Sequence, residues 1–147
     1  MNQNGRGETV FRPKVLLYNM KEDGRAGRIR VYLEENGLGM RVVAKEEYGQ
    51  YLGTLAGIPG FEDLQMRADN RSGNEQEFDD EMLVMCGLDR ETMDRFLRFF
   101  REEGLKPVAL KAALTPTNMN WTSCDLHAAI AKEHAMMQRA AQKNGNN

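Results

Sequence analysis

The sequence predicts an α/β fold: a four-stranded, largely parallel sheet built from two β-α-β-α repeats with covering helices. Two short apolar runs, residues 15–18 and 82–85, have the length and composition of buried strands. Each run is followed by apolar residues at three- and four-residue spacing, which is typical of amphipathic helices. A shift of 67 positions aligns residues 15–45 with residues 82–112 without a gap, which indicates an internal repeat.

The composition suits a single small domain of 147 residues. The two cysteines, Cys86 and Cys124, are far apart in the sequence, which favours reduced thiols in a cytoplasmic protein. No apolar run approaches the ~20 residues of a membrane span, and the N-terminus is unlike a signal sequence. The 20 basic and 22 acidic residues give a net charge of -2. We therefore expect neither a membrane nor a nucleic-acid partner.

The first repeat is expected at residues 14–58, after a disordered stretch at residues 1–13. Its first helix ends at Gly37, because glycine adopts the left-handed C-cap conformation at little cost. Residues 40–44 form the next strand, parallel to the first through a right-handed crossover. A second helix ends at Gly57 and carries an apolar face made of Tyr48, Tyr51, Leu52 and Leu55.

Residues 59–81 are expected to form an acidic, flexible linker, because they lack an apolar period. The alternative is that the acidic end of this segment, residues 75–81, binds a partner.

The second repeat is expected at residues 82–141, followed by a frayed tail at residues 142–147. Asp89 is placed to cap its first helix by accepting a hydrogen bond from a backbone N–H. Gly104 ends this helix as Gly37 ends the first one. The fourth strand then follows at residues 108–114.

Beyond the fourth strand, the shift between the two repeats changes from 67 to 78 positions. About 11 residues, 114–124, are therefore additional in the second repeat, and they follow the carboxyl end of a strand, where α/β sheets usually bind ligands. Thr122 and Asp125 fit a capping box for the last helix, and Trp121 and Leu126 fit a hydrophobic staple. Trp121 is thus interpreted as an anchor, with a ligand-stacking surface as the alternative.

The candidate ligand-binding residues around this insertion are Lys111, Thr115, Thr117, Asn118 and Trp121. The threonine and asparagine side chains can also stabilise a turn by bonding to its backbone, which is their structural interpretation. Lys111 is interpreted as a charge that protects an edge strand from aggregation, or else as the residue that holds an anion. None of the polar loop residues is a general acid or base near neutral pH, so we predict no catalytic residue.

A second, less specific candidate for anion binding is the start of the first helix, with Gly24, Arg25, Gly27 and Arg28. It lacks the glycine pattern and the lysine of a phosphate-binding loop. On the last helix, Cys124, His127 and His134 have the spacing of metal ligands, but they also flank an apolar stripe and no second cluster accompanies them. We therefore predict no metal and no cofactor.

The second half of the chain resembles a bacterial family known as a domain of unknown function, number 3783. The similarity runs from Met82 through the glycine stop at Gly104 to residues 111–118, then to Trp121 and a helix ending near His134. Its most specific part is the Thr-Pro-Thr-Asn run at residues 115–118 with the tryptophan that follows. The resemblance implies a compact α/β domain and no particular chemistry.

These patterns leave three functions open. The leading hypothesis is a small cytoplasmic binding or regulatory module, with an unknown small molecule or protein partner at residues 111–121. An enzyme would use Lys111 or His127 on a phosphorylated or carboxylated substrate. A protein-interaction scaffold, such as a homodimer, would use an exposed Phe99 and the methionines.

Overall fold

The computed structural model describes residues 11–61 and 77–145. The start of the chain up to residue 10, residues 62–76 of the predicted linker and the last two residues lie outside this description. Among the described residues, no helix has both the length and the apolarity needed to cross a membrane.

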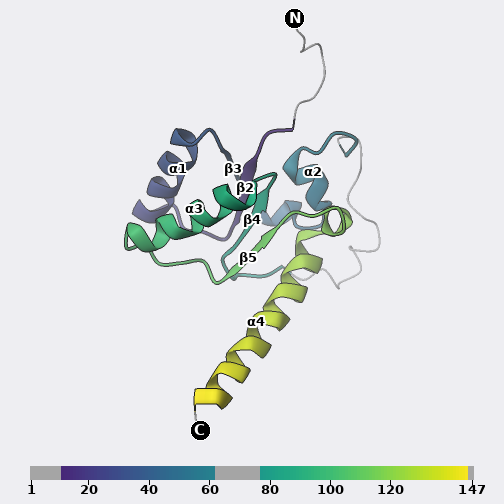
Figure 1. Cartoon of the computed structure of the whole chain (residues 1–147). Helices are drawn as coiled ribbons and strands as arrows, with labels where there is room; N and C mark the ends of the chain where they lie inside the picture. Colours follow the sequence, from purple (N-terminus) through teal and green to yellow (C-terminus); the bar gives the residue numbers. More distant parts are fainter. Residues whose placement is uncertain (1–10, 62–76, 146–147) are drawn as a thin grey trace, which may run out of the picture.

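The strands form one open sheet in the order β3 (Gly39–Val43), β2 (Lys14–Tyr18), β4 (Met82–Cys86) and β5 (Leu110–Ala113) (Figure 1). β2 pairs with β3, and β4 with β5, in parallel, as tight β-α-β units require. The two central strands, β2 and β4, run antiparallel. The sheet is therefore mixed, with one antiparallel pair between two parallel ones.

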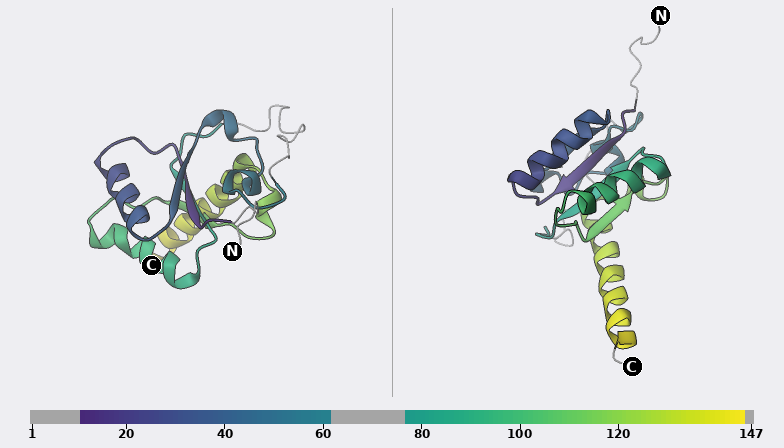
Figure 2. Two further views of the ribbon diagram at one scale, coloured as in Figure 1. Left: turned by 90° about the horizontal axis from the view of Figure 1, so that it is seen from above. Right: turned by 60° about the vertical axis from the view of Figure 1, so that its left-hand side comes forward.

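Helices cover both faces of this sheet (Figures 1 and 2). One face carries α1 (Gly24–Glu35) and α3 (Arg90–Glu102). The other face carries α2 (Leu52–Ala56) and the first part of α4 (Ser123–Gly145). The rest of α4 projects from the body, and two short 3-10 helices, η1 (Lys45–Glu47) and η3 (Asn118–Asn120), lie in the connections.

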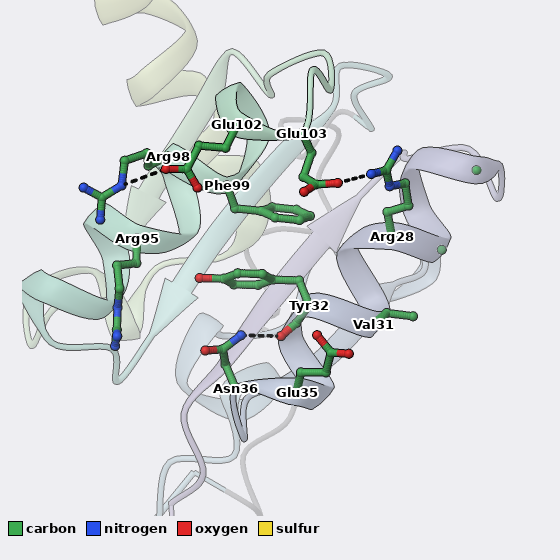
Figure 3. Close-up of a pocket in the computed structure, with 12 residues that line it drawn as sticks. Arg28, Val31, Tyr32, Glu35, Asn36, Arg95, Arg98, Phe99, Glu102 and Glu103 are labelled. Carbon is green, nitrogen blue, oxygen red and sulfur yellow. Dashed lines mark hydrogen bonds and ion pairs between the residues drawn. The ribbon is translucent and has the colours of Figure 1, made fainter.

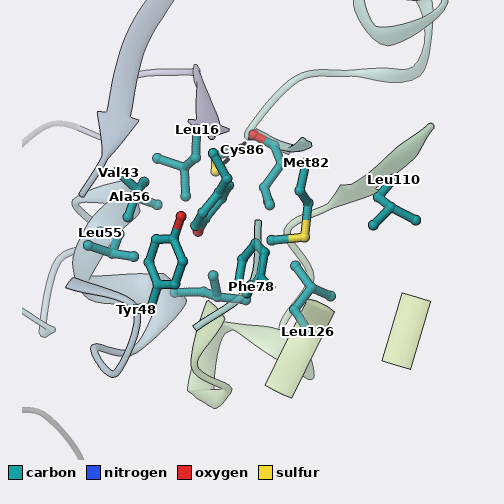
Figure 4. Packing of buried hydrophobic residues seen from close by; sticks show 13 residues of the cluster. Leu16, Val43, Tyr48, Leu55, Ala56, Phe78, Met82, Cys86, Leu110 and Leu126 are labelled. Carbon is teal, nitrogen blue, oxygen red and sulfur yellow. Dashed lines mark hydrogen bonds between the residues drawn. The ribbon is translucent and has the colours of Figure 1, made fainter. Parts of the chain in front are cut away.

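The central strands alternate their side chains between two apolar clusters. Val15 and Leu17 pack towards α1 and α3. Leu16 packs towards α2 and α4, beside Leu55 and Leu126 of the same cluster (Figure 4). Tyr18 of β2 and Val84 of β4 belong to this cluster too. Burying one such side chain stabilises the fold by about 1.5–3 kcal/mol, so both faces of β2 and β4 contribute to the core.

The predicted helix ends are confirmed. The Asp89 side chain accepts a hydrogen bond of 2.8 Å from the Thr92 N–H and so caps α3. Hydrogen bonds from the side chain and from the backbone N–H of Thr92 lower the pKa of the Asp89 carboxyl group. Gly37 and Gly104 end their helices with φ angles of 72° and 69°, in the left-handed region that glycine tolerates.

The predicted helix from Tyr48 to Leu55 is wrong in its extent, because the structure divides this segment into η1 and the short α2. Tyr51 is extended, with a ψ angle of 143°. It forms an isolated antiparallel bridge with Thr122, and the neighbouring Leu52 N–H donates to the Trp121 carbonyl at 2.8 Å. A tertiary contact thus overrides the local helical pattern.

The two β-α-β units share their order but differ in detail. Lys14 lies opposite Gly39, 25 positions further on, whereas Met82 lies opposite Leu110, 28 positions further on. The helices that follow have 5 and 23 residues. α4 also continues to Gly145, through the first residues of the predicted frayed tail. The structure establishes the two units, and the full β-α-β-α repeat stays a prediction.

The end of the predicted linker belongs to the folded body. Phe78 is 6% exposed and its ring stacks on Tyr48 at 4.5 Å. The Asn19 amide donates to the carbonyls of Phe78 and Asp80 at 2.8 and 2.9 Å. Phe78 is therefore part of the core, while Glu77, Asp79 and Asp80 are exposed.

A buried hydroxyl pair offers a test of the packing between β2 and α4. The Tyr18 and Ser123 hydroxyl oxygens lie 2.7 Å apart, and both residues are 0% exposed. We expect Tyr18→Phe and Ser123→Ala each to cost about 1–3 kcal/mol of unfolding free energy, because each leaves a buried hydroxyl without its partner. The double variant should lose less than the sum, as measured by urea unfolding. Fully additive losses would contradict this coupling.

Candidate functional site

The polar loop after β5 is held together by Asn118. The Asn118 side-chain oxygen accepts from the Thr115 N–H at 2.8 Å, and its amide donates to the Ala113 carbonyl at 3.1 Å. The Asn118 N–H in turn donates to the Thr115 hydroxyl at 3.0 Å. Because Asn118 is only 7% exposed, these bonds describe a structural turn, which was the alternative interpretation of these residues.

Trp121 and the start of α4 are also engaged within the chain. Trp121 is half-buried against the same apolar cluster as Leu126, as a hydrophobic staple requires. The Thr122 N–H donates to the Asp125 carboxylate at 3.1 Å, and the Asp125 N–H donates to the Thr122 hydroxyl at 3.1 Å. The predicted capping box is confirmed. Thr117 is exposed, and its side chain makes no capping bond to η3.

Lys111 lies apart from this loop. β5 is an edge strand, as the protective role of Lys111 requires, and Lys111 stands opposite Leu83 on the face covered by α1 and α3. Its ammonium group donates to the Val108 carbonyl at 2.8 Å, so the side chain runs back towards the start of the strand. The structure therefore does not bring Lys111 together with Thr115, Thr117 or Asn118.

Lys111 instead borders a hollow of about 510 Å³ between α3 and β5. Two cationic side chains, Lys111 and Arg101, share the lining with Gly104. The other lining residues are apolar: Leu83, Leu97, Phe100, Leu105, Pro107 and Val108. Among the described residues, neither cation forms an ion pair with a carboxylate.

Arg101 was not singled out from the sequence. The signal for it was available in the spacing of Met93, Leu97 and Arg101, which places one arginine at the end of an apolar stripe on this helix. Such a stripe alone does not reveal a hollow, because the hollow also depends on how β5 lies beside α3.

The predicted anion site at the start of α1 is already occupied by groups of the chain itself. Asp23 caps the helix by accepting from the Ala26 N–H at 3.1 Å. Arg25 pairs with Glu81 and donates to the Lys106 carbonyl, and Arg28 pairs with Glu103. Both guanidinium charges at Arg25 and Arg28 are thus balanced by carboxylates.

The two groups proposed for an enzyme, Lys111 and His127, do not converge. His127 packs from α4 on the opposite face of the sheet, where its ring stacks on Phe78 at 4.0 Å. Its Nε2 atom lies 2.8 Å from the Asp80 carboxylate.

Burial raises the pKa of the Cys86 thiol to about 12, so this cysteine is not a thiolate near neutral pH. Within residues 11–61 and 77–145, no three potential metal ligands form a cluster.

The comparisons with known proteins concern the second half of the chain. Residues 81–137 match the model of a family described as a domain of unknown function (DUF3783). The match confirms the resemblance predicted from residues 115–118 and Trp121. It covers β4, α3, β5, η3 and the greater part of α4. Comparison with curated proteins and comparison with solved structures each gave no match.

Replacing Asn118 tests whether the loop after β5 is structural. We expect Asn118→Ala to lower the free energy of unfolding by about 2 kcal/mol, because it removes bonds to the backbone of Ala113 and Thr115. Asn120→Ala, at an exposed position of the same loop, is the matched control and should change stability by less than about 0.5 kcal/mol. Equal effects of the two substitutions in urea unfolding would show that Asn118 is not the residue that holds the loop.

Proposed function

We propose that the protein is a cytoplasmic, non-catalytic module that binds a small amphipathic carboxylate in the hollow between α3 and β5. The ligand would have an apolar body and one anionic head. The observation that carries this proposal is the lining of the hollow: six apolar side chains, two cations and no carboxylate. A volume of about 510 Å³ lies within the range of small-molecule sites.

The apolar side of the lining explains what the body of the ligand would gain. Leu83, Phe100 and Val108 form a floor that is 0–3% exposed, and Leu97 and Leu105 form half-buried walls. The floor is already out of contact with water, so the gain comes from covering the exposed part of the walls, at roughly 25 cal/mol for each Å² of apolar area removed from water. A purely hydrophilic anion would leave the walls uncovered.

The two cations explain the choice of a carboxylate head. Lys111 uses one of the three hydrogens of its ammonium group on the Val108 carbonyl, which leaves donors for a ligand. Arg101 adds a planar guanidinium group suited to a carboxylate. A carboxylate head could accept hydrogen bonds from both the Lys111 ammonium and the Arg101 guanidinium group while the apolar body of the ligand stays against α3. An amphipathic carboxylate therefore fits this lining better than a neutral ligand.

The two β-α-β units are further proposed to be copies of one ancestral unit. In support, the Leu38 N–H donates to the Leu33 carbonyl at 2.8 Å, and the Leu105 N–H donates to the Phe100 carbonyl at 2.8 Å. These two bonds lie 67 positions apart and follow Gly37 and Gly104, the glycines with matching φ angles. On this proposal, the hollow at Lys111 is a feature that the second copy acquired.

Titration with decanoate tests the ligand class directly. We expect decanoate to bind at least about tenfold more tightly than 1-decanol, which has the same chain without the charge. Acetate, which has the charge without the chain, should not raise the melting temperature at the same concentration. Calorimetric titration of the full chain provides the affinities. Equal binding of decanoate and decanol would show that the cations do not select the ligand.

Variants of the two cations locate the site. Lys111→Met and Arg101→Met should each weaken decanoate binding by roughly tenfold, since each removes a charged hydrogen-bond donor. Lys106→Met is the matched control, because Lys106 is exposed nearby and does not line this hollow. If all three variants bind decanoate like the unaltered protein, the ligand lies elsewhere.

A further inference from the structure

A second concave surface, the α1–α3 groove, lies on the outer side of the helical layer (Figure 3). Its volume is about 740 Å³, and its floor is the ring pair of Tyr32 and Phe99, whose centroids lie 4.3 Å apart with the rings tilted by 30°. Phe99 is 8% exposed, so the expectation of an exposed Phe99 is wrong. The ring is buried because Tyr32 covers it from α1.

The groove lies where the two β-α-β units meet. Of its 12 lining residues, 10 form pairs that are 67 positions apart, among them Arg28 with Arg95, Tyr32 with Phe99, and Glu35 with Glu102. The Arg28–Glu103 ion pair and the Tyr32–Phe99 contact show that α1 and α3 run in opposite directions. The lining is therefore nearly twofold symmetric about the aromatic pair.

The charges at the two ends of the groove do not follow this symmetry. At the end formed by the start of α1 and the end of α3, Arg28 pairs with Glu103. The corresponding positions at the other end are Arg95 and Asn36, and the Asn36 amide donates to the Tyr32 carbonyl at 2.8 Å instead of balancing a charge. Arg95 and Glu35 both line the groove and are exposed, and among the described residues neither forms an ion pair.

The wall of the groove on α1 is low and partly apolar. Val31 is 51% exposed and gives this wall an apolar surface. Gly24 and Gly27 also line the groove, and a Cβ atom at either position would meet nothing within 4 Å. Gly27, inside the helix, costs up to about 1 kcal/mol relative to alanine without a steric need in this chain. The wall thus allows another surface to approach closely.

We infer that the α1–α3 groove is the interface of a twofold homodimer, in which it packs against the same groove of a second copy. In a twofold contact the surface must complement itself. The groove satisfies this condition because it carries both Arg95 and Glu35, neither of which forms an ion pair in the described part of the chain, so that each Arg95 can pair with the partner's Glu35. The contact would also cover Val31 in both copies. The lining of the groove has three arginines and three glutamates, so its charges balance and no net repulsion opposes the association.

Charge reversal tests this interface sharply. Sedimentation equilibrium of the unaltered full chain should show a dimer. Arg95→Glu and Glu35→Arg should each weaken the dimer by at least about tenfold, because each replaces two attractive contacts by two repulsive ones. The double variant with both substitutions should regain the dimer, since the pairs are then restored with opposite polarity.

Two control variants separate the interface from general charge effects. Arg90→Glu on α3 and Glu34→Arg on α1 change exposed residues of the same helices that do not line the groove, and both should remain dimeric. Circular dichroism melting checks that every variant is folded. The inference is overturned if the unaltered protein is a monomer, if the single reversals leave the dimer intact, or if the double variant stays monomeric.

Discussion

The antiparallel pairing of β2 with β4 is the constraint on which the rest of the structure depends. Leu16, Leu17, Leu83 and Val84 lie opposite one another in this pair and are at most 1% exposed. Because both faces of the pair are apolar, each face needs its own helical layer, which α1 with α3 and α2 with α4 provide. Either β-α-β unit alone would have two strands and half of this core, too little for independent stability.

The two helical layers differ, and this difference places the two proposed surfaces. The layer of α1 and α3 is nearly symmetric, so it leaves a shallow groove along its middle and an apolar hollow beside the edge strand β5. The other layer combines the short α2 with the long α4, and the additional loop between β5 and α4 joins them through the Trp121 carbonyl and Thr122. The loop therefore completes the core, while the charged and apolar surfaces that suit a ligand or a partner lie across the sheet.

The elements of the fold could be predicted from the sequence because their signals are local. The caps at Asp89 and Thr122 and the glycine stops at Gly37 and Gly104 depend on residues within a few positions of one another. The antiparallel join of the two units is a long-range feature, and so is the burial of Phe78 within an acidic segment. The same limit applies to the site. Lys111 stood out on an apolar strand, whereas the position of Arg101 in the same lining depends on how α3 lies beside β5.

Native-state hydrogen exchange of the full chain, followed by NMR, tests the central place of the β2–β4 pair most directly. We predict that amide hydrogens bonded between these two strands exchange most slowly, with opening free energies near that of global unfolding. Amides of β3, β5 and the projecting part of α4 should exchange through smaller openings. The β2–β4 pair is not the central element if its amides exchange as fast as those of the edge strands while α1 and α3 remain protected.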